Sequence, residues 1–178
     1  MTMTIFTIGH STHSIEDFID TLRAYDIQLL VDVRTIPKSR HNPQFNSDVL
    51  EKSLQASGIG YVHLAGLGGL RRAKKDSVNQ AWKNTSFRGF ADYMQTEEFE
   101  EGIVKLVELG ENRKTVIMCA EAVPWRCHRS LIGDALLVRG ISVLDIMSKA
   151  VVKEHVMTPW AEVQGMKVLY PKKEERQQ

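Results

Sequence analysis

The sequence has few cysteines and no long apolar run. Only two of its 178 residues are cysteines, Cys119 and Cys127, which is too few for the disulfide framework of a small secreted domain. No apolar stretch approaches the roughly 20 residues that span a bilayer, and the first residues lack the basic start and apolar core of a signal peptide. We therefore expect a cytoplasmic protein that keeps its thiols reduced and does not enter membranes.

The chain also has almost no net charge, because its basic and acidic residues nearly cancel to +1. The two signs are nevertheless separated along the sequence. Residues 34–46 hold three basic residues and no acid, and residues 63–88 hold six basic residues and one acid, whereas residues 97–111 hold six acids and one lysine. Basic loops of this kind attract anions such as phosphate, nucleotides or nucleic acid.

Standard cofactor and metal motifs are missing as well. The chain lacks the glycine-rich loops typical of nucleotide-binding folds, and residues 7–11 do not complete the dinucleotide pattern. Cys119 and Cys127 are eight residues apart, not the two to four residues between the ligands of a structural zinc pair. We expect no metal site, and the sequence identifies no cofactor.

Strand-like and helix-like segments alternate along the chain. The pattern predicts strands near residues 4–8, 28–33, 60–62, 115–118, 141–146 and 151, and helices near residues 14–24, 47–56, 87–94, 96–110, 124–139 and after 159. Such alternation is typical of a mainly parallel sheet flanked by helices. We expect a single α/β domain over residues 1–171, with a Rossmann-like three-layer arrangement, and a frayed charged tail over residues 172–178.

Polar side chains follow the predicted strands, and ligands of parallel α/β folds bind beyond the carboxyl ends of the strands. The candidate catalytic residues at this edge are His10, Asp32, Cys119, Glu121, Cys127 and His128. The candidate substrate-binding residues are Ser11, Arg34, Ser39, Arg40, Gly68, Gly69 and Arg129. We expect these groups to meet in one basic pocket.

The segment from Cys119 to Arg129 combines thiols with cations. A helix that opens at Pro124 would direct free backbone N–H groups towards Cys127, which favours a thiolate or a bound anion. Cys119, at the end of the preceding strand, should then lie close to Cys127, with Arg126 and Arg129 beside the pair.

Each of these residues also has a structural explanation. Buried cysteines are common in protein cores, and Asp32 can hold Arg34 or a backbone N–H in a purely structural ion pair. His10 can bridge loops, paired glycines mark most tight turns, and the basic run over residues 71–75 can be a solvated loop.

Three functions remain open. The first is an enzyme, a hydrolase or a transferase, that acts on an anionic small molecule, phosphorylated or nucleotide-like, with Arg34, Arg40 and Arg129 as anion ligands. The second is a nucleic-acid-binding module linked to DNA or base metabolism, in which residues 71–75 lie beside aromatic side chains that can stack bases. The third is a thiol redox or metal-binding protein. The oligomeric state and the substrate cannot be inferred.

A set of motifs resembles the uncharacterised domain-of-unknown-function family 488 (DUF488). The resemblance lies in residues 7–11, 32–34, 37–39, 43–45, 67–69, 87–94, 119–121 and 127–129, and it follows nearly the whole chain in order. It implies that these loop motifs belong together, but it implies no reaction.

Overall fold

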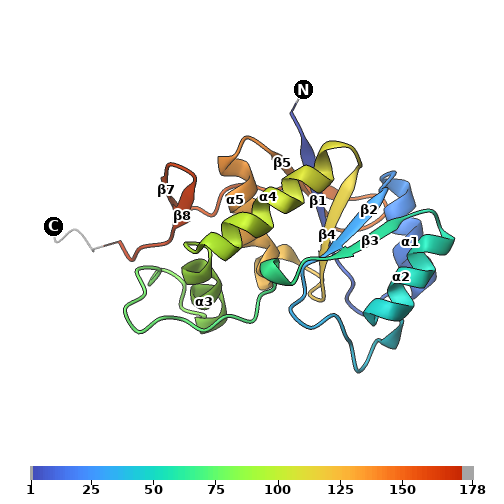
Figure 1. The fold of residues 1–178 in the computed structure, drawn as a ribbon, viewed down its shortest axis with the longest axis horizontal. Coiled ribbons are helices and arrows are strands. Elements are labelled where there is room, and N and C mark those ends of the chain that lie inside the picture. Colours follow the sequence, from blue (N-terminus) through green and yellow to red (C-terminus); the bar gives the residue numbers. More distant parts are fainter. Residues whose placement is uncertain (1, 174–178) are drawn as a thin grey trace.

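A twisted six-stranded sheet forms the centre of the computed structural model, which describes residues 2–173 (Figure 1). The strands are β1 (Thr4–Gly9), β2 (Leu29–Asp32), β3 (Gly60–His63), β4 (Thr115–Cys119), β5 (Ser142–Ile146) and β6 (Val152–Glu154). Their order in the sheet is β3-β2-β4-β1-β5-β6, and all neighbours are parallel except β6, which pairs antiparallel with β5. The predicted α/β fold is confirmed.

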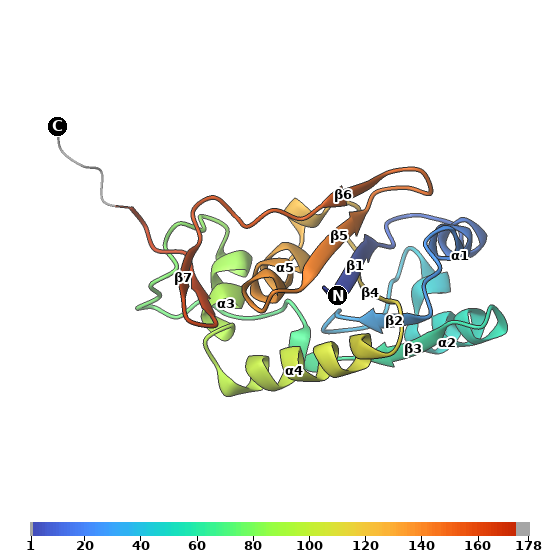
Figure 2. The ribbon, with the colours of Figure 1, turned by 90° about the horizontal axis from the view of Figure 1, so that it is seen from above.

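Helices cover both faces of this sheet (Figure 2). The helices α1 (Ile15–Ala24) and α2 (Ser47–Ala56) pack on one face, and α3 (Thr85–Tyr93), α4 (Glu97–Glu111) and α5 (Arg129–Val138) pack on the other. Alternate strand residues point to the two cores, as Leu29 and Leu30 do in β2. The three layers agree with the predicted arrangement.

The starts of α1 and α4 were predicted from the side chains that cap them, whereas α3, which Asn84 caps, begins at Thr85 and not near Phe87. The Ser14 side chain accepts a hydrogen bond from the Asp17 N–H at the start of α1, and Thr96 caps α4 in the same way. The predicted start at Pro124 is wrong, because Pro124–Arg126 forms a short 3-10 turn and α5 begins only at Arg129. Proline suits the first position of either kind of turn, so it does not distinguish them.

Two smaller predictions need correction. The residue before α2 is Asn46, and Ser47 is the first residue of the helix rather than its cap. The helix expected after Pro159 is absent from the described residues, where β7 (Glu162–Gln164) and β8 (Lys167–Leu169) form a hairpin instead. Gly165, with a φ of +64°, supplies the left-handed turn residue that this hairpin needs.

The last described residues lie outside the six-stranded sheet. Tyr170 is fully buried and so holds the last described segment against the core. Residues 174–178 of the predicted tail lie outside the described residues. Across residues 2–173, no helix has both the length and the apolarity to cross a membrane.

The connections after β2 and β4 diverge, although these strands are neighbours. The chain leaves β2 towards α2, on one face of the sheet, and leaves β4 towards α5, on the other. A crevice forms at such a switch point, beyond the carboxyl ends of the two strands, and it is where open α/β sheets bind ligands.

Candidate functional site

A pocket of about 390 Å³ lies at this switch point. Its wall comes from the loops after β2 and β4, the turn after β3 and the start of α3. The lining residues are Arg34, Thr35, Ile36, Lys38, Gly69, Leu70, Ser86, Phe87, Cys119, Ala120, Glu121, Arg126, Cys127 and His128. The sequence analysis selected six of them as site residues: Arg34, Gly69, Cys119, Glu121, Cys127 and His128.

The buried carboxylate of Asp32 holds Arg34 in place below this pocket. Its Oδ1 accepts hydrogen bonds from the backbone N and the Nε of Arg34, at 3.1 and 2.9 Å, and its Oδ2 accepts from Nη2 at 2.7 Å. The Tyr61 hydroxyl donates to the same Oδ2. Asp32 is not part of the pocket wall. Its carboxylate oxygens are occupied by groups of the protein itself, so its role is to position Arg34.

His10 lies behind Arg34, outside the pocket wall. Its ring stacks on Phe45, its Nδ1 contacts the Ser11 carbonyl, and its Nε2 lies 3.4 Å from Nη1 of Arg34. Burial lowers the pKa of His10, and the positive charge of Arg34 acts in the same direction. The backbone N–H of Ser11 donates to the Ala120 carbonyl, which extends the pairing of β1 with β4 into the loops.

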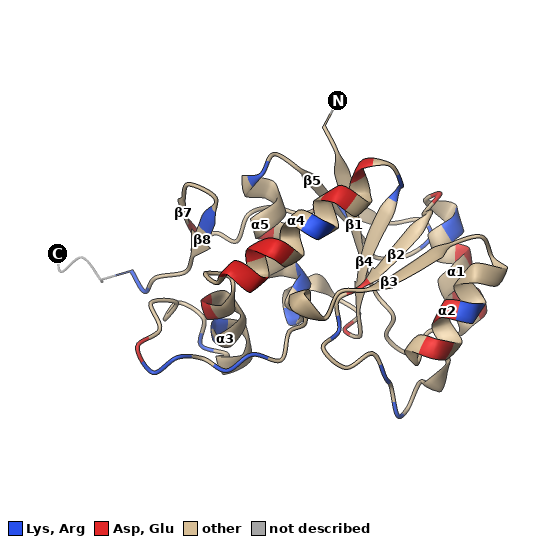
Figure 3. Cartoon of the chain, viewed as in Figure 1, with Lys and Arg blue, Asp and Glu red and all other residues tan. Residues whose placement is uncertain are grey.

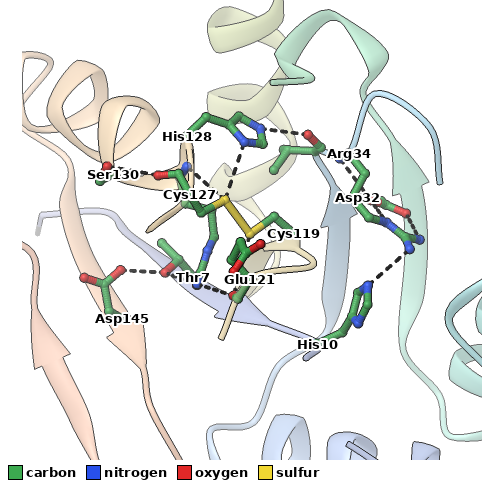
Figure 4. The surroundings of a disulfide bond; sticks show 12 residues. Thr7, His10, Asp32, Arg34, Cys119, Glu121, Cys127, His128, Ser130 and Asp145 are labelled. Atoms are coloured by element: carbon green, nitrogen blue, oxygen red, sulfur yellow. Dashed lines mark hydrogen bonds and ion pairs between the residues drawn. A yellow bond between two sulfur atoms is a disulfide. The ribbon is translucent and has the colours of Figure 1, made fainter. Parts of the chain in front are cut away.

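Cys127 and His128 form the chemically most capable pair. The His128 Nε2 lies 2.9 Å from the Val33 carbonyl, and the His128 Nδ1 lies 3.4 Å from the Cys127 sulfur (Figure 4). A carbonyl only accepts hydrogen bonds, so Nε2 carries the proton and Nδ1 presents its lone pair to the sulfur. Burial lowers the pKa of His128 to about 4, against the effect of the Val33 hydrogen bond. His128 is therefore neutral at pH 7.

A helix N-terminus reaches the same sulfur. The backbone N–H of Arg129, the first residue of α5, donates to the Cys127 sulfur at 3.5 Å. Free N–H groups and the helix dipole both stabilise negative charge at this end of a helix. The N-terminus of α5 thus lies beside the Cys127 sulfur, as expected, although the helix starts later than predicted.

Cys119 lies on the opposite side of the Cys127 sulfur. The two cysteines are joined as a disulfide in the structure (Figure 4). The second contact of the Cys119 sulfur is the Glu121 carbonyl, at 3.8 Å. The Glu121 side chain is exposed at the pocket wall. The proximity of the two cysteines agrees with the prediction.

Arg129 points away from the pocket. It is 1% exposed, and its guanidinium donates to the Thr7 hydroxyl and to the Glu121 carbonyl. Burial lowers the pKa of Arg129 to about 10, which still leaves it charged at pH 7. Arg129 therefore braces the loop after β4 against β1 and lies outside the set of residues that could touch a ligand.

Of the remaining predicted binding residues, Gly69 lines the pocket, and Ser39, Arg40 and Gly68 lie outside its wall. Ser39 stabilises its own loop, since its backbone N donates to Asn46 and its hydroxyl accepts from the Asn42 N–H. Arg40 is exposed and lies outside the pocket wall. Gly68 and Gly69 allow close approaches, because a Cβ at Gly69 would lie 2.6 Å from the His128 Nδ1.

Several lining residues were not selected from the sequence. Lys38 and Arg126 are exposed cations on facing loops, and Ser86 and Phe87 come from the first turn of α3. The charge signal in residues 34–46 pointed to Lys38, and Arg126 was expected beside the thiols. Figure 3 shows acidic residues gathered on α4 and basic residues on the loops, which agrees with the separation seen in the sequence.

Part of the basic loop over residues 71–75 makes contacts within the protein. The Arg71 guanidinium lies 3.7 Å above the Tyr93 ring and donates to the carbonyls of Gly68 and Ala65. The exposed cations of this loop are Arg72, Lys74 and Lys75. Nucleic-acid binding by this loop stays a prediction. Among residues 2–173, no group of three or more His, Cys, Asp or Glu side chains is placed to hold a metal ion.

Gly9 sets the distance between the loops after β1 and β4. A Cβ at this position would lie 1.6 Å from the Glu121 carbonyl oxygen, which is backbone and cannot step aside. We expect Gly9→Ala to displace the loop that carries Glu121 and to lower the free energy of unfolding by about 1–3 kcal/mol. Urea unfolding measures the change. Gly66→Ala is the matched control, because its Cβ would meet nothing closer than 4.0 Å, and an equal loss in both variants would contradict the expectation.

Comparison with known proteins agrees with the motif resemblance. The family model described as "Domain of unknown function DUF488" matches residues 14–136. This range contains Asp32, Arg34 and both cysteines, whereas His10 precedes it. The searches of curated proteins and of solved structures returned no match. Since the matched range is more than half of the 178 residues, the chain belongs to the DUF488 family.

Proposed function

We propose that the protein is an enzyme that acts on an anionic small molecule, phosphorylated or nucleotide-like, with Cys127 as its nucleophile. The observation that carries this proposal is the setting of the Cys127 sulfur, between the unprotonated Nδ1 of His128 and the backbone N–H of Arg129. A thiol in contact with a base and a helix N-terminus is activated for attack.

The proposed roles follow from the contacts. In the reduced protein, the Cys127 thiol donates its proton to His128 Nδ1, and the N–H of Arg129 stabilises the thiolate that forms. The Val33 carbonyl keeps His128 in the tautomer that accepts this proton. With a pKa of about 4, the imidazole of His128 is unprotonated at neutral pH and holds the thiol proton only weakly, so it returns that proton readily to a leaving group.

Charge and size support an anionic substrate. Lys38 and Arg126 project at the pocket wall against one exposed carboxylate, Glu121. Arg34 is already balanced by Asp32, so Lys38 and Arg126 carry the excess positive charge. The volume of about 390 Å³ lies within the range of small-molecule sites, about 300–1,000 Å³.

Two alkylating agents that differ in charge test this proposal on the reduced protein. Cys127 should react faster with iodoacetate than with the neutral iodoacetamide, by about fivefold, since an ion pair at about 4 Å in water contributes about 1 kcal/mol. Glutathione, measured in parallel, gives the ratio for a thiol without a cationic pocket. Peptide mass spectrometry identifies the alkylated cysteine, and AMP or inorganic phosphate should slow the reaction.

Neutral variants of the two cations provide the control. Lys38→Gln combined with Arg126→Gln should bring the ratio down to that of glutathione, while Lys52→Gln, an exposed lysine of α2 outside the pocket, should leave it unchanged. A Cys127 that shows no preference for iodoacetate in the unmodified protein would overturn the anionic-substrate proposal.

A further inference from the structure

The two cysteines of the site have opposite surroundings, although their sulfurs are bonded to each other. The Cys127 sulfur receives a backbone N–H, which stabilises a thiolate, and faces the Nδ1 of His128, which can take up the thiol proton. Apart from Cys127, the polar partner of the Cys119 sulfur among residues 2–173 is the carbonyl oxygen of Glu121. A carbonyl accepts a thiol proton in a hydrogen bond and repels a thiolate, so this contact favours the thiol form of Cys119 once the pair is reduced.

This difference assigns different roles to the two sulfurs. The thiolate is the form that attacks electrophiles and peroxides, and the contacts place it at Cys127. A protonated thiol in contact with the oxidised sulfur then serves as the resolving group, and Cys119 occupies that position. Both sulfurs line the same pocket, so a small hydroperoxide can approach them.

We propose that the Cys119–Cys127 pair is a reversible dithiol that reduces hydroperoxides, with Cys127 as the attacked thiol and Cys119 as the resolving thiol. The Cys127 thiolate attacks one peroxide oxygen, the O–O bond breaks, and an alcohol or water leaves after it takes up a proton. Cys127 is then a sulfenic acid. As the Cys119 sulfur attacks the Cys127 sulfur, the Cys119 proton passes to the departing hydroxyl, the S–O bond breaks, water leaves, and the disulfide forms.

The electron balance is complete with the two thiols and the peroxide. The dithiol loses two electrons as the S–S bond forms, and the peroxide gains two as its O–O bond breaks. An external dithiol reductant restores the pair by thiol–disulfide exchange. This proposal shares the reactive Cys127 with the proposed function but does not need an anionic substrate. Oxidation would also block the nucleophile, so the same chemistry would regulate the site.

The test uses the reduced full chain and one equivalent of hydrogen peroxide. The unmodified protein should lose both free thiols in Ellman's assay, and its intact mass should correspond to one internal disulfide that dithiothreitol reverses. Cys119→Ser should stop at the sulfenic acid, which dimedone traps on Cys127. Cys127→Ser should react with peroxide at least tenfold more slowly, because Cys119 lacks the groups that favour its thiolate.

Three outcomes would overturn the assignment: peroxide reactivity no greater than that of glutathione, a sulfenic acid trapped on Cys119 instead of Cys127, or only mixed disulfides between chains. If a serine variant does not fold, brief dimedone trapping in the unmodified protein still identifies the attacked cysteine by peptide mass spectrometry. The ratio of the rates with iodoacetate and iodoacetamide separates the two proposals. If Cys127 prefers iodoacetate but does not react with peroxide, the anionic-substrate proposal is supported and the redox role is excluded.

Discussion

Replacing Asp32 with alanine is expected to lower the free energy of unfolding by about 3–5 kcal/mol, because it leaves a buried cation without its partner. Asp32 is fully buried and Arg34 is 7% exposed. Three of the hydrogen bonds that fix Arg34 end on the Asp32 carboxylate, and its guanidinium would keep the hydrogen bond to the Phe45 carbonyl and the contact with His10. Urea unfolding of the reduced protein measures the loss.

A double replacement distinguishes an unpaired charge from general damage to the sheet. In Asp32→Ala/Arg34→Met both charges are gone, and a buried ion pair replaced by apolar groups often costs little. We therefore expect the double variant to be more stable than Asp32→Ala alone. Asp76→Ala, which removes an exposed acid, should change stability by less than about 0.5 kcal/mol. A double variant less stable than the single one would contradict this account.

The same ion pair shows what the sequence reveals about this site. The closeness of the two residues along the chain, with only Val33 between them, was enough to foresee that Asp32 can hold Arg34 or a backbone N–H. The carboxyl ends of β2 and β4 then brought Arg34 and Cys119 to one pocket, as the rule for parallel sheets predicts. Contacts between residues at the end of one strand, or between the ends of neighbouring parallel strands, can therefore be predicted from the order of strands and polar residues in the sequence.

Side-chain direction in the loop after β4 did not follow in the same way. Pro124 was compatible with both an α-helix and a 3-10 turn, and the later start of α5 turns Arg129 inward to Thr7 while Arg126 stays at the surface. The helix starts five residues later than predicted, and because successive helical residues point about 100° apart, this changes which arginine faces the pocket. Helix periodicity alone could not identify that arginine.

The polar network behind α5 was also missed, since it depends on a segment far along the chain. His155 lies 2.9 Å from Asp134 of α5 and 3.7 Å from Asp145 of β5, and Tyr170 donates to the second oxygen of Asp134. Residues near 155 carry no motif that places them over α5. A contact across about 20 residues between an irregular segment and a helix is set by packing, which the local sequence does not encode.

This network makes stability depend on pH. Burial opposes the charged form of His155, but its hydrogen bonds to Asp134 and Asp145 outweigh that effect and raise the pKa of His155 to about 9. The folded state therefore binds a proton that the unfolded state, with a pKa of about 6.5, releases earlier. The resulting stabilisation is fully present below pH 6.5 and is lost as the pH rises through about 9.

Replacing Asp134 with alanine should remove this stabilisation and lower the free energy of unfolding by about 3–5 kcal/mol at pH 6, because the fully buried carboxylate has three protein donors. A change in pKa from 6.5 to about 9 corresponds to roughly 3 kcal/mol. Asp134→Ala should therefore differ from the unmodified protein most at pH 6 and least at pH 9.5, as measured by urea unfolding.

His155→Gln is the matched variant, because its side chain can still donate to Asp134 but does not titrate. The free energy of unfolding of this variant should vary less between pH 6 and pH 9.5 than that of the unmodified protein, and the difference between the two curves isolates His155 from the cysteines and other groups that titrate in the same range. If both proteins lost stability in parallel as the pH rose, His155 would not be the charged centre of the network, and Asp134 would act there only as a hydrogen-bond acceptor for Thr158 and Tyr170.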